Sequence, residues 1–302
     1  MKVSFFSRRA AKNAGWLVAG RVLHMALAFL VNLLTARYLG PSNYGLVNYA
    51  ALYTAFFTSF ATLGLSSLLL KDFMDDPEGA GTTVGTAIAM RLLSSTLSAV
   101  SILAIVAAVD RGERLTMTVV ALYSMSLIFQ AFDTIQYWFQ SRLESKYATI
   151  ATSVGYIIVS FYKGLLLVLG KDVRWFAISN TIDYAVAAIV FLGLYKWRGG
   201  PRLHISPAKG RALLRQSGSF ILCGLMVSVY NCTDRFMLKH LLDEASVGYY
   251  ATATSLATVW TFVLSAIIDS ITPGIMQAHR TDRAQFVRHN RQLYALVFYL
   301  SV

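Results

Sequence analysis

Eight long apolar stretches separated by short loops limit what this chain can fold into more than any other feature of its sequence. They cover roughly residues 13–36, 44–70, 82–109, 115–140, 147–170, 175–197, 214–238 and 245–271, and a ninth begins near residue 293. About 20 apolar residues cross the hydrocarbon core of a bilayer, so each of the eight is long enough to span it. Only 14% of the residues are charged, against about 25% in soluble domains. We therefore predict an all-α polytopic membrane protein.

Lys and Arg residues are divided unequally between the loops. With the N-terminus placed in the cytoplasm, 17 of them lie on the cytoplasmic side and 6 on the external side. This bias follows the positive-inside rule, so we expect a cytoplasmic N-terminus. It also explains the net charge of +12 without nucleic-acid binding. The basic start, MKVSFFSRRAAK, precedes an apolar run too long for a cleaved signal peptide, which predicts a permanent first span.

The longest loop, between the sixth and seventh spans, is basic and contains Gly and Pro, so it is the best linker candidate. We expect a six-span lobe at residues 1–197, a cytoplasmic linker at 198–213, and the start of a second lobe at 214–302. The second lobe would comprise spans seven, eight and part of nine. On this interpretation the chain is a fragment whose second lobe is truncated.

A shift of 203 residues supports an internal repeat. It lays YLGPSNYGLVNYA over LLDEASVGYYATA, with Gly45 on Gly248. Each half then has a span, a tight external turn, which is Gly40-Pro41 in the first half, and a span entry rich in Gly and Tyr. A repeat of six spans in one orientation predicts two lobes related by an axis along the membrane normal.

Charged residues remain inside the predicted spans after the loop charges are set aside. The cations are Arg21, Arg91, Lys163 and Arg235, and the acids are Asp133, Asp183, Asp234 and Asp269. A charge at the bilayer centre costs about 2.5–3.5 kcal/mol even on the mildest scale, so such residues should face a wet cavity or one another. Polar residues accompany them at helical spacing in five spans, which favours an aqueous lumen over polar helix packing alone.

The cations differ in depth. Arg91 lies too deep in its span to snorkel, which favours contact with a substrate. Arg21 and Lys163 lie nearer the ends of their spans, so snorkelling is their alternative role. Arg235 follows Asp234 directly on a helix, so the two side chains cannot face each other, and a structural role competes with a site role for both.

The remaining acids, Asp133, Asp183 and Asp269, could pair with the cations or carry a coupling ion. Cys223 and Cys232 lie on different faces of one predicted helix, so neither a disulfide nor a metal site is expected. The acidic loop KDFMDDPEG is better explained as a solvated turn than as a metal site. No P-loop is present. We expect no bound cofactor, and an H⁺ or Na⁺ gradient is the candidate energy source.

Three stretches resemble one known family. They are KNAGWLVAGRVLHMALAFLVNLLTARYLGPSNYGLVNYA, FATLGLSSLLLKDFMDDPEGAGTTVGTAIAMRLL and CTDRFMLKHLLDEASVGYYATA. All are similar to the polysaccharide transporters, the O-antigen (Wzx-type) flippases of the multidrug/oligosaccharidyl-lipid/polysaccharide exporter superfamily. The resemblance implies two six-helix lobes around a solvent-filled, V-shaped cavity.

The resemblance also implies a function. A flippase of this kind moves an undecaprenyl-pyrophosphate-linked oligosaccharide across the bacterial inner membrane by alternating access, for O-antigen, capsule or exopolysaccharide synthesis. Cations in the lumen would hold the pyrophosphate; the matching positions are Arg21 and Arg91, and the position of Lys163 in its span adds a third. The implied partners are the lipid-linked oligosaccharide, membrane lipids, a polysaccharide polymerase and chain-length proteins, and not nucleic acid.

Two other functions remain open. A cation-coupled multidrug or small-molecule exporter would share the architecture, but Arg21 and Arg91 favour an anionic cargo. A polysaccharide polymerase or membrane glycosyltransferase would need a sizeable external loop with catalytic residues, and the external loops here are short. We therefore expect a transporter and not an enzyme.

Overall fold

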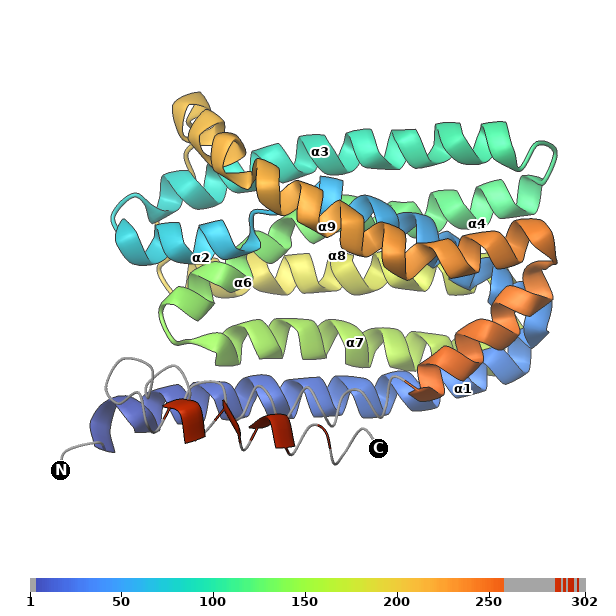
Figure 1. Ribbon diagram of the computed structural model, residues 1–302, viewed down its shortest axis with the longest axis horizontal. Helices are drawn as coiled ribbons and strands as arrows, with labels where there is room; N and C mark the ends of the chain where they lie inside the picture. Colours follow the sequence, from blue (N-terminus) through green and yellow to red (C-terminus); the bar gives the residue numbers. More distant parts are fainter. Residues whose placement is uncertain (1–3, 258–285, 289, 292, 296–297, 299–302) are drawn as a thin grey trace. The chain divides into compact units, whose positions relative to one another are not determined.

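The computed structural model describes residues 4–257, 286–288, 290–291, 293–295 and 298, with side chains from residue 25 onward except at 26 and 67. The chain forms two compact units, Met1–Ala251 and Thr252–Val302. Among the described residues, the first unit contains the long elements and is a bundle of helices running back and forth (Figure 1).

The elements of the first unit follow one another with short connections. They are α1 (Ser4–Thr62), α2 (Ser66–Asp75), α3 (Ala80–Val109), α4 (Arg114–Ser124), α5 (Ser126–Gln130), η1 (Ala131–Asp133), α6 (Thr134–Ser141), α7 (Ser145–Val168), α8 (Val173–Trp197) and α9 (Pro207–Leu241). Within the described part, five segments are long and apolar enough to cross a membrane: α3, Arg114–Ser141, α7, α8 and α9. The prediction of an all-α, multi-pass membrane protein is confirmed.

The predicted turn at Gly40-Pro41 is confirmed. Gly40 has φ 73° and ψ 171°, and the chain reverses there between the two halves of α1 (Figure 1). Glycine reaches a positive φ without steric cost. Pro41 then opens the second half, where a missing N–H costs nothing because the first amides of a helix have no partner within it.

The predicted second span, 44–70, is wrong at its C-terminal end. Helix α1 ends at Thr62, and α2 begins only at Ser66 after a turn in which Leu63 and Gly64 have φ of 54° and 58°. Helix α9 passes close to this turn: a Cβ on Gly64 would lie 2.9 Å from the Cβ of Phe220. A side chain at position 64 would therefore push the two segments apart.

The predicted fourth span, 115–140, is present but broken into α4, α5, η1 and α6. The hydroxyls of Ser124, Ser126 and Thr134 each donate to the carbonyl three residues earlier, at 3.1, 2.7 and 2.9 Å. Such bonds compete with the regular ladder and bend helices. The break puts a 3₁₀ turn at Asp133, and turns of this kind often mark functional hinges.

The seventh span begins earlier than predicted. Pro207 is the first residue of α9, and the Ser206 hydroxyl caps it by accepting from the Lys209 N–H at 3.4 Å. Helix α9 therefore starts within the predicted linker, 198–213. A helix over residues 244–257 matches the start of the eighth predicted span. The rest of that span and most of the ninth lie outside the described residues, and the division into two lobes stays a prediction.

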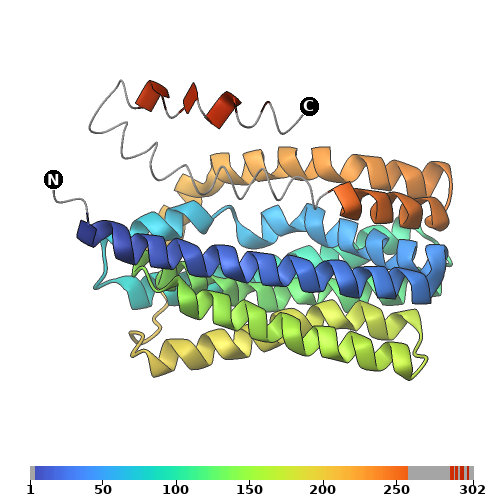
Figure 2. The same ribbon diagram turned by 90° about the horizontal axis from the view of Figure 1, so that it is seen from below.

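Helix α1 is central to the packing of the first unit. It contacts α7 and α9, which lie on opposite sides of it (Figure 2). One apolar cluster surrounds Tyr49 and Phe176, and a second surrounds Phe139 and Phe191. Because lipid tails are as apolar as these side chains, tight van der Waals packing and polar contacts have to hold such helices together.

Candidate functional site

Four of the predicted charged residues meet inside the first unit. They come from α3, η1, α7 and α8 and are Arg91, Asp133, Lys163 and Asp183. Asp133 lies within electrostatic range of both Arg91 and Asp183, and Asp183 within range of Lys163. Among the described residues, neither carboxylate has a hydrogen-bond or ion-pair partner. The group therefore combines two cations with two acids that share one electrostatic environment without a direct bond between them.

Arg91 is the most deeply buried of these residues, with 1% of its surface exposed. Its Nε donates to the Thr62 carbonyl and its Nη1 to the Thr134 hydroxyl, both at 3.3 Å. The guanidinium lies 5.7 Å from the centre of the Tyr137 ring, and its Nη2 has no partner among the described residues. In this conformation Arg91 joins the end of α1 to the 3₁₀ break, and one of its N–H groups remains unused.

Lys163 lines a polar cavity of about 160 Å³. The walls come from both halves of α1 and from α4, α7 and α8, and include Asn32, Thr35, Asn48, Ser179 and Asn180. The Thr35 hydroxyl is buried and has no hydrogen-bond partner among the described residues. A cavity that combines an ammonium group, a free hydroxyl and amides can bind a small anion or a sugar hydroxyl.

The other predicted site residues lie elsewhere. Asp234 accepts a hydrogen bond from the Tyr250 hydroxyl, which links α9 to the helix over 244–257. The Nε of Arg235 is buried without a partner among the described residues. The side chain of Arg21 and the whole of Asp269 lie outside the described part.

A polar network at the C-terminal end of α9 was not predicted from the sequence. The Tyr49 hydroxyl lies 2.8 Å from the Tyr53 hydroxyl, 3.0 Å from Asp110 Oδ2 and 3.2 Å from His240 Nε2. These residues belong to α1, the α3–α4 connection and α9. In sequence, Asp110 and His240 look like ordinary charges near loops, and only the i, i+4 pair of tyrosines indicates a shared face.

Lys239 extends this network. Its Nζ lies 2.7 Å from Glu244 Oε1 and 3.2 Å from Glu113 Oε2. Glu244 also accepts from the Ser42 hydroxyl at 3.2 Å. We call these residues, with Tyr49, Tyr53, Asp110 and His240, the outer network, because the topology prediction puts them on the external side. It ties α9 to α1 and to the α3–α4 connection.

The pKa values of two carboxyl groups in the outer network are shifted in opposite directions. The hydrogen bond from Thr116 lowers the pKa of Glu113, partial burial opposes this, and the nearby Lys239 lowers it further. Burial raises the pKa of Asp110, although the hydrogen bond from Tyr49 and the positive charge of Lys239 act against it. The network is thus built from one acid that favours its charged form and one that resists it.

The two segments aligned by the repeat touch each other. A Cβ on Gly45 would lie 1.8 Å from the Glu244 carbonyl oxygen, and a Cβ on Gly248 would lie 2.3 Å from the Pro41 carbonyl oxygen. The 203-residue shift aligns Gly45 with Gly248 and Pro41 with Glu244. The contact is therefore reciprocal, as expected when a twofold-like axis passes through it, which supports the repeat.

The start of α9 is also tied to the rest of the unit. Lys209 Nζ lies 2.8 Å from Asp72 Oδ1, and the Thr83 hydroxyl donates to Asp72 Oδ2 at 2.7 Å. Together with the outer network, these contacts hold α9 to the other helices at both of its ends.

Comparison with known sequences identifies the family. A sequence profile of polysaccharide biosynthesis proteins matches residues 10–279. The chain belongs to that family. A comparison with curated proteins found no match.

Solved structures show that this polysaccharide biosynthesis protein has a transporter fold. One match is a multidrug resistance MATE family transporter of the MOP superfamily in an outward-facing conformation. Another is a MOP superfamily transporter from Pyrococcus furiosus whose reported binding-pocket polarity suggested a different function. Each match has 14% identity and a TM-score of 0.70 and covers 96% of this chain and 70% of the other. The chain is thus a multi-pass membrane protein of the polysaccharide biosynthesis family with the fold of these two transporters.

Proposed function

We propose that this chain is part of a flippase that moves a lipid-linked oligosaccharide with an anionic pyrophosphate from the cytoplasmic to the external leaflet of a bacterial inner membrane. The observation that carries the proposal is the polar cavity with Lys163, inside a transporter fold that belongs to a polysaccharide biosynthesis family. A pyrophosphate that leaves water needs fixed cationic donors, and hydroxyls and amides can receive sugars.

The cavity is too small for a whole oligosaccharide. A volume of about 160 Å³ is below the roughly 300–1,000 Å³ of typical ligand pockets. In the proposal, the cavity widens when the helices move apart, and Lys163, Arg91 and Arg21 then receive the pyrophosphate and the first sugars. The lipid tail stays in the hydrocarbon throughout.

The two acids supply a route for energy coupling. Asp133 and Asp183 lie within electrostatic range of the cations and make no direct hydrogen bond or ion pair among the described residues. Binding of H⁺ or Na⁺ at either acid would change the local charge and thereby the affinity for an anion at Lys163. In the proposal a cation gradient drives alternating access, and the translocated lipid-linked oligosaccharide passes to a polysaccharide polymerase and its chain-length partners.

The test is the leaflet in which the lipid-linked oligosaccharide accumulates. Cells that lack the gene are complemented with the complete gene, either wild type or carrying Lys163→Met or, as a control, Lys196→Met, which alters an exposed lysine at the end of α8. We expect cytoplasmic accumulation in the null strain, relief by wild type and by the control, and little relief by Lys163→Met. Accumulation in the external leaflet of the null strain would refute the flippase function.

Export of small cationic molecules is a second candidate. It is favoured by the two intramembrane acids, Asp133 and Asp183, because acids inside a membrane bundle suit a cationic cargo. This function predicts that the null strain becomes sensitive to cationic dyes and drugs while its surface polysaccharide stays unchanged.

A further inference from the structure

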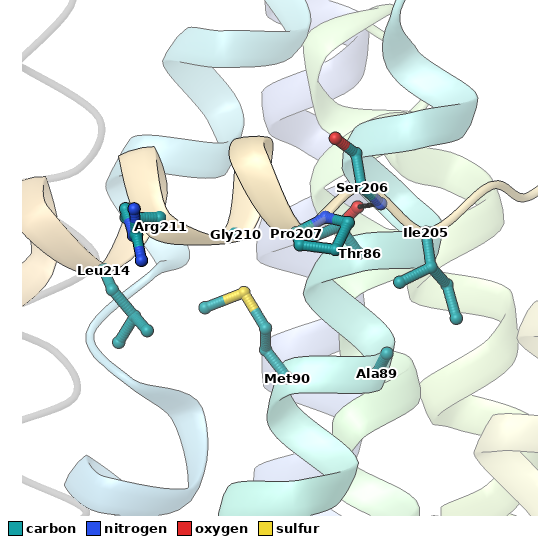
Figure 3. Close-up of a pocket in the computed structure, with 9 residues that line it drawn as sticks. All are labelled: Thr86, Ala89, Met90, Ile205, Ser206, Pro207, Gly210, Arg211 and Leu214. Atoms are coloured by element: carbon teal, nitrogen blue, oxygen red, sulfur yellow. Dashed lines mark hydrogen bonds between the residues drawn. The ribbon is translucent and has the colours of Figure 1, made fainter.

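A second, larger cavity of about 360 Å³ lies where α3 and α9 begin (Figure 3). Helix α9 lines it with one face, because its contributing residues recur at intervals of three and four. The lining residues are Thr86, Ala89 and Met90 of α3, Ile205 and Ser206 of the preceding loop, and Pro207, Gly210, Arg211 and Leu214 of α9.

The walls of this cavity are held in place by bonds that need no ligand. The Ser206 N–H donates to the Thr86 hydroxyl at 3.0 Å, and the His204 N–H donates to the Gly81 carbonyl at 3.4 Å. In the first turn of α9, Lys209 is paired with Asp72. The cavity is therefore preformed, and the polar groups of its frame are already used.

The interior of the cavity is apolar. Met90 and Leu214 point into it from opposite walls (Figure 3), and Ile205 closes one side. Gly210 keeps it open, because a Cβ at this position would lie 3.2 Å from Met90 Sδ. A sugar or a nucleotide would find few hydrogen-bond partners here, whereas a hydrocarbon chain fits the lining.

One charged residue lines the cavity. Arg211 is exposed, and its guanidinium has no partner among the described residues. Arg215 lies one turn further along the same face of α9 and Arg202 in the loop before it, and in the described structure their side chains are also exposed and unpaired. Guanidinium groups bind phosphate in a two-pronged geometry. The free charge here complements a phosphate.

The depth of these groups matches a lipid. Both α3 and α9 are long enough to cross the membrane, and the cavity lies within the first three turns of α3 and the first two turns of α9. At about 1.5 Å of rise per residue, Leu214 lies roughly 4.5 Å deeper along α9 than Arg211. The charge is thus at the level of headgroups, and the apolar lining extends from it towards the acyl chains.

We propose that this cavity binds an anionic phospholipid of the surrounding bilayer, with its phosphate at Arg211 and an acyl chain against Met90 and Leu214. Such a lipid bridges α3 and α9 and adds to the Lys209–Asp72 pair in holding this end of the bundle closed. The inference concerns a bound lipid and not the cargo, so it holds or fails independently of the flippase function.

The experiment measures lipid retention. The purified full chain is placed in nanodiscs of phosphatidylcholine, either alone or mixed with phosphatidylglycerol, and bound lipid is counted by native mass spectrometry after release into detergent. We expect phosphatidylglycerol to be retained in preference, and Arg211→Gln to weaken its binding about tenfold, the loss of roughly one charge-assisted hydrogen bond. The matched control is Arg142→Gln, whose guanidinium stacks 4.8 Å from the Trp138 ring, outside the cavity.

A second variant separates a lipid in the cavity from loose attraction to the basic surface. Ala89→Leu keeps every charge and fills the apolar space, so it should weaken retention as Arg211→Gln does. The proposal is overturned if phosphatidylglycerol and phosphatidylcholine are retained equally. It is also overturned if Arg142→Gln weakens retention as much as Arg211→Gln, if Ala89→Leu has no effect, or if undecaprenyl phosphate is retained where phosphatidylglycerol is not.

Discussion

Replacing Lys239 by methionine should open the outer end of the bundle. The side chain is only 9% exposed, and its ammonium group lies 2.7 Å from Glu244 and 3.2 Å from Glu113. Removing one partner of a buried ion pair costs about 3–5 kcal/mol. The carboxylate side chains here are 25% and 47% exposed, so solvent screening reduces the cost to about 1–2 kcal/mol.

A change of that size shifts an equilibrium about 5- to 30-fold. Cys232 can report it, because this residue is buried where α9 meets α1, with its Sγ 3.8 Å from the Leu52 carbonyl oxygen. In a Cys223→Ala background Cys232 is the only thiol of the chain. We expect a membrane-impermeant maleimide, added from outside, to label it about 5- to 30-fold faster in Lys239→Met.

The matched control is Lys171→Met, which removes an exposed lysine from a loop on the same predicted side of the membrane. Equal labelling of Cys232 in Lys239→Met and Lys171→Met would refute the reasoning. It would mean that the outer network does not hold α9 against α1.

Three further predictions follow from the contacts described above. The raised pKa of Asp110 means that the folded state holds the proton of this carboxyl more tightly than the unfolded state does. The contribution of Asp110 to the free energy of unfolding should therefore grow as the pH falls from above the folded-state pKa towards about 3.9, the pKa of an unperturbed Asp. Asp110→Asn should remove this pH dependence from melting curves recorded at a series of pH values, and an unchanged pH dependence would contradict the assignment. Gly45→Ala should destabilise the protein by about 1–3 kcal/mol in chemical or thermal denaturation because its Cβ has no room, whereas Gly164→Ala, with open space around it, should be neutral or slightly stabilising. Lys163→Met and Asp183→Asn should each lower the free energy of unfolding, and the double variant should lose less than the sum of the two single losses, because each single change leaves one charge without its compensation. Additive losses would show that the two charges do not interact.

The sequence predicts the fold at the level of spans and turns. Long apolar runs with few charges form helices in a bilayer, since a helix makes its backbone hydrogen bonds within itself. The Gly40-Pro41 pair is a strong local signal for a turn. The breaks at Gly64 and Asp133 could not be predicted in the same way. The first depends on the close approach of α9, and the second on which of many Ser and Thr hydroxyls bond back to the chain.

The intramembrane charges of the candidate site could be picked out from the sequence for the same reason. Intramembrane charge is rare enough that Arg91, Lys163, Asp133 and Asp183 stand out, and the structure brings these four together. Sequence does not reveal that Arg91 is engaged by backbone and hydroxyl groups whereas Lys163 faces a cavity. The outer network escaped prediction because its charges lie near span ends, where charge is common.

The reciprocal contact of Gly45 and Gly248 has a consequence for the origin of the chain. A surface that meets its own repeat in this way is self-complementary, so a half-length ancestor could have paired with a second copy of itself through the same glycine. Gene duplication and fusion would then have preserved a homodimer inside one polypeptide. The two segments still constrain each other: with no side chain on either glycine, the backbones lie in close contact, and a bulkier residue at one glycine calls for a matching accommodation opposite the other.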